Sequence, residues 1–281
     1  MKRIIFAGLA SLLVLTTSCE KKDNSSDEGN GKLKVSITDS PFPFELIQSA
    51  SVTIVKGEVK AADVNGNEEA SFLTFFEDSA TFNLMDLRNG ITDELTVADI
   101  PAGSYDEVRL VISSASITLV NGQTYDLKIP SGSSSGLKVK IDPSIDVNGG
   151  LTSELVLDFD VSKSFVLKGN MKTPAGINGF NFKPVIRAVN TSSSGRLQGM
   201  VTDTTDMAVA GVSVWLEQDT VVASALSDTT GYYKIIALPE GEYDVYATKP
   251  GFDTVSVQGI MINAANSTQQ DFTLTPSSQT K

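Results

Sequence analysis

The sequence predicts an all-β protein in which two antiparallel β-sandwich domains follow each other along the chain. In many segments apolar residues occupy every second position, which is the spacing of half-buried strands. Asn-Gly pairs recur between these segments and favour tight hairpins, because both residues tolerate positive φ angles. A polar break at residues 191–195 (TSSSG) separates two regions in which strands and turns are spaced differently, and it marks the expected linker between the domains.

The first 18 residues have the features of a signal peptide that is removed during export. Lys2 and Arg3 precede an apolar run over residues 4–15, and small residues follow it directly before Cys19. The run is too short to cross a bilayer as a helix. Cys19 is the only cysteine of the chain, so its position at the cleavage point indicates lipidation. The alternative is an ordinary cleaved signal that leaves a free, reactive thiol.

This cleavage site resembles the lipobox of bacterial lipoproteins, with Thr16 at the place where most carry leucine and Leu15 one residue earlier. The looser pattern is similar to that of Bacteroidetes-type lipoproteins. The resemblance implies that Cys19 anchors the protein to a lipid bilayer in the cell envelope, on either face of the outer membrane. Residues 19–31 (CEKKDNSSDEGNG) are polar and lack apolar periodicity, so we expect a disordered tether between the anchor and the folded part.

Composition argues against an enzyme and against a nucleic-acid-binding protein. The net charge of −12 repels a phosphate backbone. The chain has no histidine, which removes the commonest general base and a frequent zinc ligand. Residues 132–136 (GSSSG) have the spacing of a nucleophile elbow, but the required helix and histidine partner are missing. We therefore expect a non-catalytic protein without a resident cofactor.

Residues 32–190 form the first expected sandwich. Apolar side chains share one face in its clearest strands, namely Leu33, Val35 and Ile37 in the first and Val108, Leu110 and Ile112 in a later one. Asn-Gly turns punctuate the region at residues 65–66, 89–90, 121–122, 148–149 and 178–179. Only residues 160–165 (DVSKSF) indicate a helical turn.

Four segments of this region resemble an uncharacterised family of bacterial lipoprotein domains, the domain-of-unknown-function family 4382. They are residues 33–41 (LKVSITDSP), 100–108 (IPAGSYDEV), 157–164 (LDFDVSKS) and 182–187 (FKPVIR). The resemblance implies no particular activity.

Residues 196–275 resemble carboxypeptidase regulatory-like domains in the order of their motifs. These motifs are residues 196–203 (RLQGMVTD), 210–216 (AGVSVWL), 228–236 (DTTGYYKII), 238–245 (LPEGEYDV), 251–252 (GF) and 271–274 (DFTL). The resemblance implies a seven-stranded, transthyretin-like sandwich, often classed with carbohydrate-binding-like folds and mostly acting as a folded accessory. Residues 276–281 are expected to form a disordered tail.

One motif occurs in both domains. Residues 100–106 (IPAGSYD) parallel residues 238–244 (LPEGEYD). In each copy we expect Pro and Gly to set a turn that leads into a strand, with the tyrosine packing inward.

Asp158 and Asp160 lie two residues apart on an expected strand, so both carboxylates project from one face, beside Glu154. Three interpretations remain open: a solvated face or structural hydrogen bonding, a weak Ca²⁺ site, or acid–base chemistry. We favour the first. Asp39 precedes a turn, where we expect it to bond local main-chain N–H groups.

Three aromatic side chains of the second domain are expected to face outward. Alternation places Val214 and Leu216 in the core and therefore sends Trp215 outward. The same argument exposes Tyr232 and Tyr246 while it buries Tyr233, Tyr243 and Val245. Outward aromatic rings can pack against the neighbouring domain, stack on sugar rings or fill an interface with a protein partner.

The sequence thus predicts an envelope lipoprotein that acts as a non-catalytic binding module for a glycan or for another envelope protein. Trp215, Tyr232 and Tyr246 are the candidate ligand-binding residues. The alternative is a structural spacer or pilus-like subunit whose edge strands pair with those of a neighbour.

Overall fold

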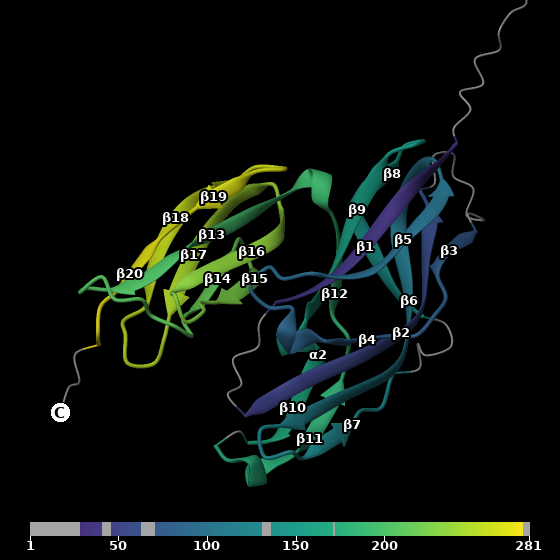
Figure 1. The fold of residues 1–281 in the computed structure, drawn as a ribbon. Coiled ribbons are helices and arrows are strands. Elements are labelled where there is room, and N and C mark those ends of the chain that lie inside the picture. The colour runs from purple at the N-terminus through teal and green to yellow at the C-terminus, as the bar shows by residue number, and fades with distance from the viewer. Residues whose placement is uncertain (1–28, 41–45, 63–70, 131–135, 171, 278–281) are drawn as a thin grey trace, which may run out of the picture.

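The computed structural model describes residues 29–40, 46–62, 71–130, 136–170 and 172–277, and within these ranges strands dominate (Figure 1). Cys19, the expected signal peptide and the serines of the GSSSG segment lie outside the described residues. Among the residues that are described, no helix is long and apolar enough to cross a membrane. The predicted all-β class is confirmed.

The large domain contains β1 to β12 and short helical turns. Its strands are β1 (Asn30–Ser40), β2 (Ile47–Ala61), β3 (Phe72–Phe76), β4 (Ala80–Asn83), β5 (Asp93–Pro101), β6 (Gly103–Leu119), β7 (Thr124–Asp126), β8 (Leu137–Val147), β9 (Thr152–Asp160), β10 (Phe165–Gly169), β11 (Ile177–Phe182) and β12 (Ile186–Asn190). The turns are η1 (Leu84–Asp86), α2 (Val161–Ser164), η2 (Pro174–Gly176) and η3 (Thr191–Ser193). The helical turn expected at residues 160–165 is α2.

Ten of these strands form one sheet. Eight of them follow the order β3-β2-β6-β8-β12-β9-β1-β5, and in addition β4 pairs with β2 and β7 with β6. The strands β10 and β11 form a separate hairpin. Most pairs are antiparallel, but β1 pairs with β9 and β12 with β8 in parallel. The end strands β3 and β5 contact each other, so the sheet wraps around a single apolar core. The alternating residues of β1 and β6 expected to be inward are all buried in it.

The segment expected as a tether, residues 19–31, overlaps the first strand, because β1 begins at Asn30 and pairs there with Pro101 of β5. Asn30 and Gly31 therefore belong to the sheet. Gly31 fits because a Cβ atom on it would lie 2.4 Å from the carbonyl oxygen of Asn148.

The small domain is a sandwich of two four-stranded sheets, β16-β13-β19 with β20 beside β13, and β15-β14-β17-β18. Its strands are β13 (Ser194–Asp203), β14 (Ser213–Glu217), β15 (Val221–Leu226), β16 (Tyr232–Pro239), β17 (Gly241–Thr248), β18 (Val255–Ile262), β19 (Ser267–Gln269) and β20 (Phe272–Leu274). An apolar cluster between the sheets contains only residues of this domain.

We predicted seven strands for this domain, whereas its described part has eight, because the last one is split at residues 270–271. The N–H of Gln270 still donates to the carbonyl of Gln198 in β13 at 2.9 Å, and side chains add two further bonds there. Tyr233 Oη donates to the carbonyl of Gln270 at 2.6 Å, and the carboxylate of Asp271 accepts from the N–H of Met200 at 2.8 Å. β19 and β20 both pair with β13 in parallel.

The segment predicted as a linker, residues 191–195, is structured. Residues 191–193 form η3, which the side chain of Asn190 caps. Ser194 and Gly195 are buried at the start of β13, where they pair with Pro239 and Leu238 of β16. The start of the expected tail is held as well, because the N–H of Ser277 donates to the carbonyl of Gly251 at 3.0 Å.

The repeated motif builds the same turn in both domains. Tyr105 Oη donates to the carbonyl of Pro101 at 2.8 Å, and Tyr243 Oη donates to the carbonyl of Pro239 at 2.9 Å. Both rings are buried, as predicted, and burial raises the pKa of each phenol. The turn thus has the geometry of a tyrosine corner, in which a buried hydroxyl bonds main chain a few residues upstream.

Candidate functional site

The two domains meet where the turn between η1 and β5 reaches the free edge of β16. Asn89 and Gly90 in this turn have φ angles of 62° and 73°. Asn89 Oδ1 accepts a hydrogen bond from the main-chain N–H of Lys234 at 2.6 Å, and its Nδ2 donates to the carbonyl of Tyr232 at 3.3 Å. The Asn-Gly pair was predicted as a turn, but sequence gave no sign that it contacts the other domain.

Apolar side chains seal part of the same interface. Val156 of β9, Val189 of β12 and Ala237 of β16 are buried together, and Ile236 packs against them. Both faces of β9 are consequently covered, one by the core of the large domain and the other by the small domain. The alternating pattern of a half-buried strand fails here for that reason.

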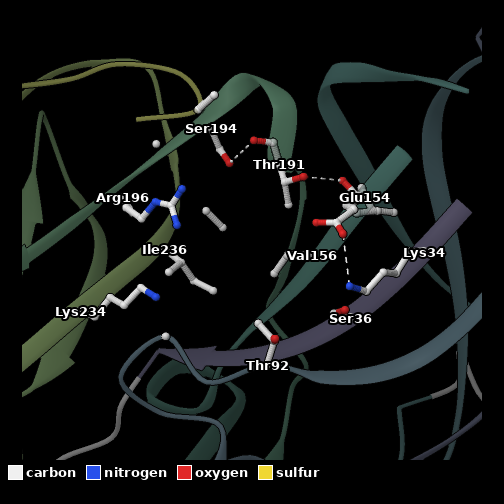
Figure 2. Close-up of a pocket in the computed structure, with 15 residues that line it drawn as sticks. Lys34, Ser36, Thr92, Glu154, Val156, Thr191, Ser194, Arg196, Lys234 and Ile236 are labelled. Atoms are coloured by element: carbon white, nitrogen blue, oxygen red, sulfur yellow. Dashed lines mark hydrogen bonds and ion pairs between the residues drawn. The ribbon is translucent and has the colours of Figure 1, made fainter. Parts of the chain in front are cut away.

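A cavity of about 380 Å³ opens between the domains beside this cluster (Figure 2). Lys34 and Glu154 come from the large domain, and Arg196 and Lys234 come from the small one. Lys34 Nζ bonds Glu154 Oε1 at 3.2 Å. No hydrogen bond or ion pair joins the side chain of Arg196 or Lys234 to another described residue, and both point into the cavity in Figure 2.

Hydroxyl groups and apolar side chains complete the cavity wall. The hydroxyl groups belong to Ser36, Thr92, Thr191 and Ser194, and the apolar side chains include Leu155, Val156, Ile236, Ala237 and Ala265. Thr191 Oγ1 donates to the carbonyl of Glu154 at 3.2 Å, and Ser194 Oγ donates to the carbonyl of Thr191 at 3.4 Å. Their oxygens keep lone pairs that can accept a hydrogen bond from a ligand.

A smaller neighbouring cavity of about 10 Å³ holds the carboxyl groups of Asp39 and Asp158. Asp39 is 4% exposed; its Oδ1 accepts from the N–H of Val161 at 3.2 Å, and its Oδ2 has no hydrogen-bond partner among the described residues. Burial and the nearby carboxylate of Asp158 raise the pKa of Asp39 well above its ordinary value. Asp39 was expected to bond local main-chain N–H groups, but the N–H that it accepts from belongs to Val161, 122 residues away.

The sequence placed Asp158 and Asp160 together on one face, but the structure gives them separate surroundings. Asp158 is buried under the small domain and forms an ion pair with Arg187, so it does not lie on a solvated face. Asp160 caps α2, accepting from the N–H of Lys163 at 3.0 Å and pairing with Lys163 Nζ at 2.8 Å. In the described part of the chain, no group of three His, Cys, Asp or Glu side chains could hold a metal ion.

Trp215 and Tyr246 form a stacked pair on the outer face of the β15-β14-β17-β18 sheet. They are directly paired across β14 and β17, with ring centroids 5.2 Å apart and planes only 9° from parallel. Glu217 holds both rings, accepting from Trp215 Nε1 at 3.3 Å and bonding the hydroxyl of Tyr246, which raises the pKa of that phenol. Both aromatic residues are half-buried, and their predicted neighbours in the core are buried.

Tyr232 does not join this pair. It lies on β16, which belongs to the other sheet of the sandwich, and its hydroxyl bonds Gln198 Oε1 at 3.2 Å. Alternation correctly predicted that Tyr232 points out of the core. It could not predict that the residue faces away from Trp215, because the assignment of strands to sheets depends on the fold.

Comparisons with known proteins agree with this architecture. The family model "Domain of unknown function (DUF4382)" matches residues 30–184, and the model "Carboxypeptidase regulatory-like domain" matches residues 196–275. No curated protein matches the chain.

Solved structures of bacterial surface proteins also match, at low similarity. A cohesin–X-dockerin complex from Acetivibrio cellulolyticus matches at 20% identity over 28% of this chain, with a TM-score of 0.24, and this chain spans about half, 56%, of its length. The minor pilin GBS52 of Streptococcus agalactiae matches at 11% identity over 88% of this chain and 98% of its own, with a TM-score of 0.25. The shaft pilin SpaA of Lactobacillus rhamnosus GG matches at 11% identity over 90% and 100%, with a TM-score of 0.27. Scores this low support no inference about function.

Proposed function

We propose that this chain, which belongs to the family of domain of unknown function DUF4382 and continues into a carboxypeptidase regulatory-like domain, is a membrane-anchored envelope lipoprotein acting as a non-catalytic carbohydrate-binding module. The observation that supports this function best is the stacked pair of Trp215 and Tyr246 on the outer face of the small domain.

This aromatic pair offers the chemistry that a sugar needs. The apolar C–H face of a pyranose packs on an aromatic ring, while carboxylates beside the ring accept hydrogen bonds from the sugar hydroxyls. Glu217 and Asp244, which pair across β14 and β17 next to the rings, supply such carboxylates. Because Glu217 already holds Trp215 and Tyr246 in place, little side-chain freedom is lost when a ligand binds.

A glycan array with the Trp215→Ala variant tests this function. Covering the ring is worth on the order of 1–3 kcal/mol, so we expect binding to weaken about 5- to 150-fold, with a small fall in melting temperature from the lost stacking on Tyr246. Tyr232→Ala is the matched control, because it removes an outward aromatic ring of the same domain from the other sheet. Equal losses in both variants, or no glycan binding by the wild type, would refute the proposal.

The membrane anchor needs its own test, because it depends on Cys19. In the native host, Cys19→Ala should release the protein from membranes or leave its signal peptide uncleaved. Membrane pelleting and the mass of the mature chain report both effects. A variant that pellets like the wild type and has the same mature mass would end the lipoprotein proposal.

The alternative of a pilus-like or spacer protein receives less support from the edges of the sheets. A pilus-like subunit needs a free edge to pair with a neighbour. In the large domain the end strands β3 and β5 contact each other, and in the small domain Asn89 occupies the edge of β16, which leaves other end strands, among them β15 and β18 of the second sheet, as edges for such pairing.

A further inference from the structure

We propose that the cavity between the two domains binds an acidic saccharide, with Arg196 and Lys234 taking the carboxylate and the remaining wall taking the sugar ring. This site lies apart from the Trp215–Tyr246 pair and does not depend on it.

The charged side chains of the cavity wall are mainly cationic, although the chain as a whole is acidic. The chain as a whole carries a net charge of −12, yet the cavity gathers three cationic side chains and one carboxylate. Lys34 is paired with Glu154, which leaves Arg196 and Lys234 as the cations of the cavity that have no ion-pair partner among the described residues. They project from β13 and β16 toward the same space (Figure 2). Two such cations attract an anion, and a guanidinium can bind a carboxylate through two parallel hydrogen bonds.

The remaining wall fits a ring that carries hydroxyl groups rather than a bare inorganic anion. Val156 and Ile236 provide an apolar surface, and Ser36 and Thr92 offer hydroxyls that bond no other residue in the described part of the chain. Thr191 and Ser194 can each accept a further hydrogen bond. A volume of about 380 Å³ lies in the usual range for small-molecule sites, about 300–1,000 Å³.

Both domains contribute to the wall, so an occupant would bridge them. Lys34, Ser36 and Glu154 belong to β1 and β9, and Arg196 and Lys234 belong to the small domain. A ligand that binds only the docked arrangement stabilises it by mass action. We therefore expect an acidic saccharide to raise the melting temperature of the full chain as well as to bind it.

The test compares D-glucuronate with D-glucose, which differ only at C6, and with inorganic phosphate, using calorimetric titration of the full mature chain. We expect glucuronate to bind at least tenfold more tightly than glucose and phosphate. Arg196→Gln and Lys234→Gln should each weaken glucuronate binding at least tenfold, and added NaCl should weaken it in the wild type. Lys140→Gln is the control, because Lys140 is an exposed lysine of β8 outside the cavity.

Separate outcomes would overturn the proposal. Equal binding of glucose would remove the role of the carboxylate, and equal binding of phosphate would reduce the site to a general anion site. Loss of glucuronate binding in Lys140→Gln would show that overall charge is responsible. The loss of glucuronate binding caused by Arg196→Gln should be the same in a Trp215→Ala background, so a failure of the aromatic site and a failure of this cavity can be told apart. Circular dichroism of each variant excludes unfolding as the cause.

Discussion

The side chain of Asn89 in the large domain accepts a hydrogen bond from the main-chain N–H of Lys234 in the small domain, 145 residues away. The same amide group donates to the carbonyl of Tyr232. β16 is the last strand of its sheet, so Asn89 takes the place that a neighbouring strand would have. A residue of a tight turn thereby fixes how the two domains dock and shapes the cavity between them.

Replacing Asn89 by glycine should loosen the interface. The change keeps the positive φ angle without strain but removes both hydrogen bonds, which we expect to cost about 1–3 kcal/mol of unfolding free energy. Small-angle scattering should show a larger radius of gyration, since the domains separate more easily. Asn121→Gly is the matched control, because Asn121 bonds only Gln123 within its own Asn-Gly turn. Identical behaviour of the two variants would contradict the docking role.

Tyr105→Phe and Tyr243→Phe should each destabilise the domain that contains the tyrosine. Each change removes a hydroxyl that donates to a proline carbonyl at the edge of the core, and leaving that carbonyl unpaired costs about 1–3 kcal/mol. Scanning calorimetry should show a lower melting temperature for both variants. Tyr246→Phe, which removes a hydroxyl on the outer face, should change stability much less. A similar loss in all three would disprove the special role of the two corners.

The buried carboxyl of Asp39 should make stability depend on pH in a definite direction. Its pKa in the folded state is raised above the ordinary value of 3.8, mainly by burial and then by the charge of Asp158. The folded state therefore holds this proton more tightly than the unfolded state does. Its contribution to stability is complete below that ordinary value and is lost as the pH rises through the folded-state pKa.

Asp39→Asn removes this titration and should raise the melting temperature at pH 8 relative to the wild type. The difference between the two proteins should shrink toward pH 4, where Asp39 is protonated in the folded state. Asp93→Asn, at an exposed position in β5, is the control and should show no such trend. A difference from the wild type that is constant across pH would refute the argument.

The ion pair between Arg187 and Asp158 should be worth more than an exposed pair. Arg187→Gln removes the guanidinium from the buried carboxylate of Asp158 beside Asp39, a loss of about 1.5–3 kcal/mol. Lys32→Gln breaks the exposed pair with Asp99 and should cost less than about 1 kcal/mol. Chemical denaturation measures both losses. Adding Asp158→Asn to Arg187→Gln should restore part of the stability, and a further loss would count against this explanation.

A fragment of residues 194–281 should fold by itself, since the apolar cluster of the small domain contains no residue of the large domain. A fragment that starts at Arg196 should melt at a lower temperature, because it lacks the pairing of Ser194 and Gly195 with β16. Circular dichroism with thermal melting compares the two. An unfolded longer fragment would show that the small domain depends on its neighbour.

The sequence alone determined the all-β class and, in the strands whose alternation it showed, which side chains face the core. Val214, Trp215 and Leu216 alternate as predicted, and Tyr105 and Tyr243 pack inward after their matching turns. These properties are local: successive side chains of a strand point to opposite faces, and Pro, Gly and Asn set turns through their own φ preferences.

Only the tertiary structure decided which outward-facing residues meet. For Asp158 the sequence left a solvated face and structural hydrogen bonding open, and the structure has the second, an ion pair with Arg187, because the small domain covers the second face of β9. Tyr232 and Trp215 both point out of the core, yet they lie on different sheets. Lys34 lies before the junction of the domains in the sequence and Arg196 lies after it, yet both line one cavity. Alternation specifies inside and outside within one strand, whereas these neighbours depend on sheet pairing and domain docking, which have no local period in the sequence.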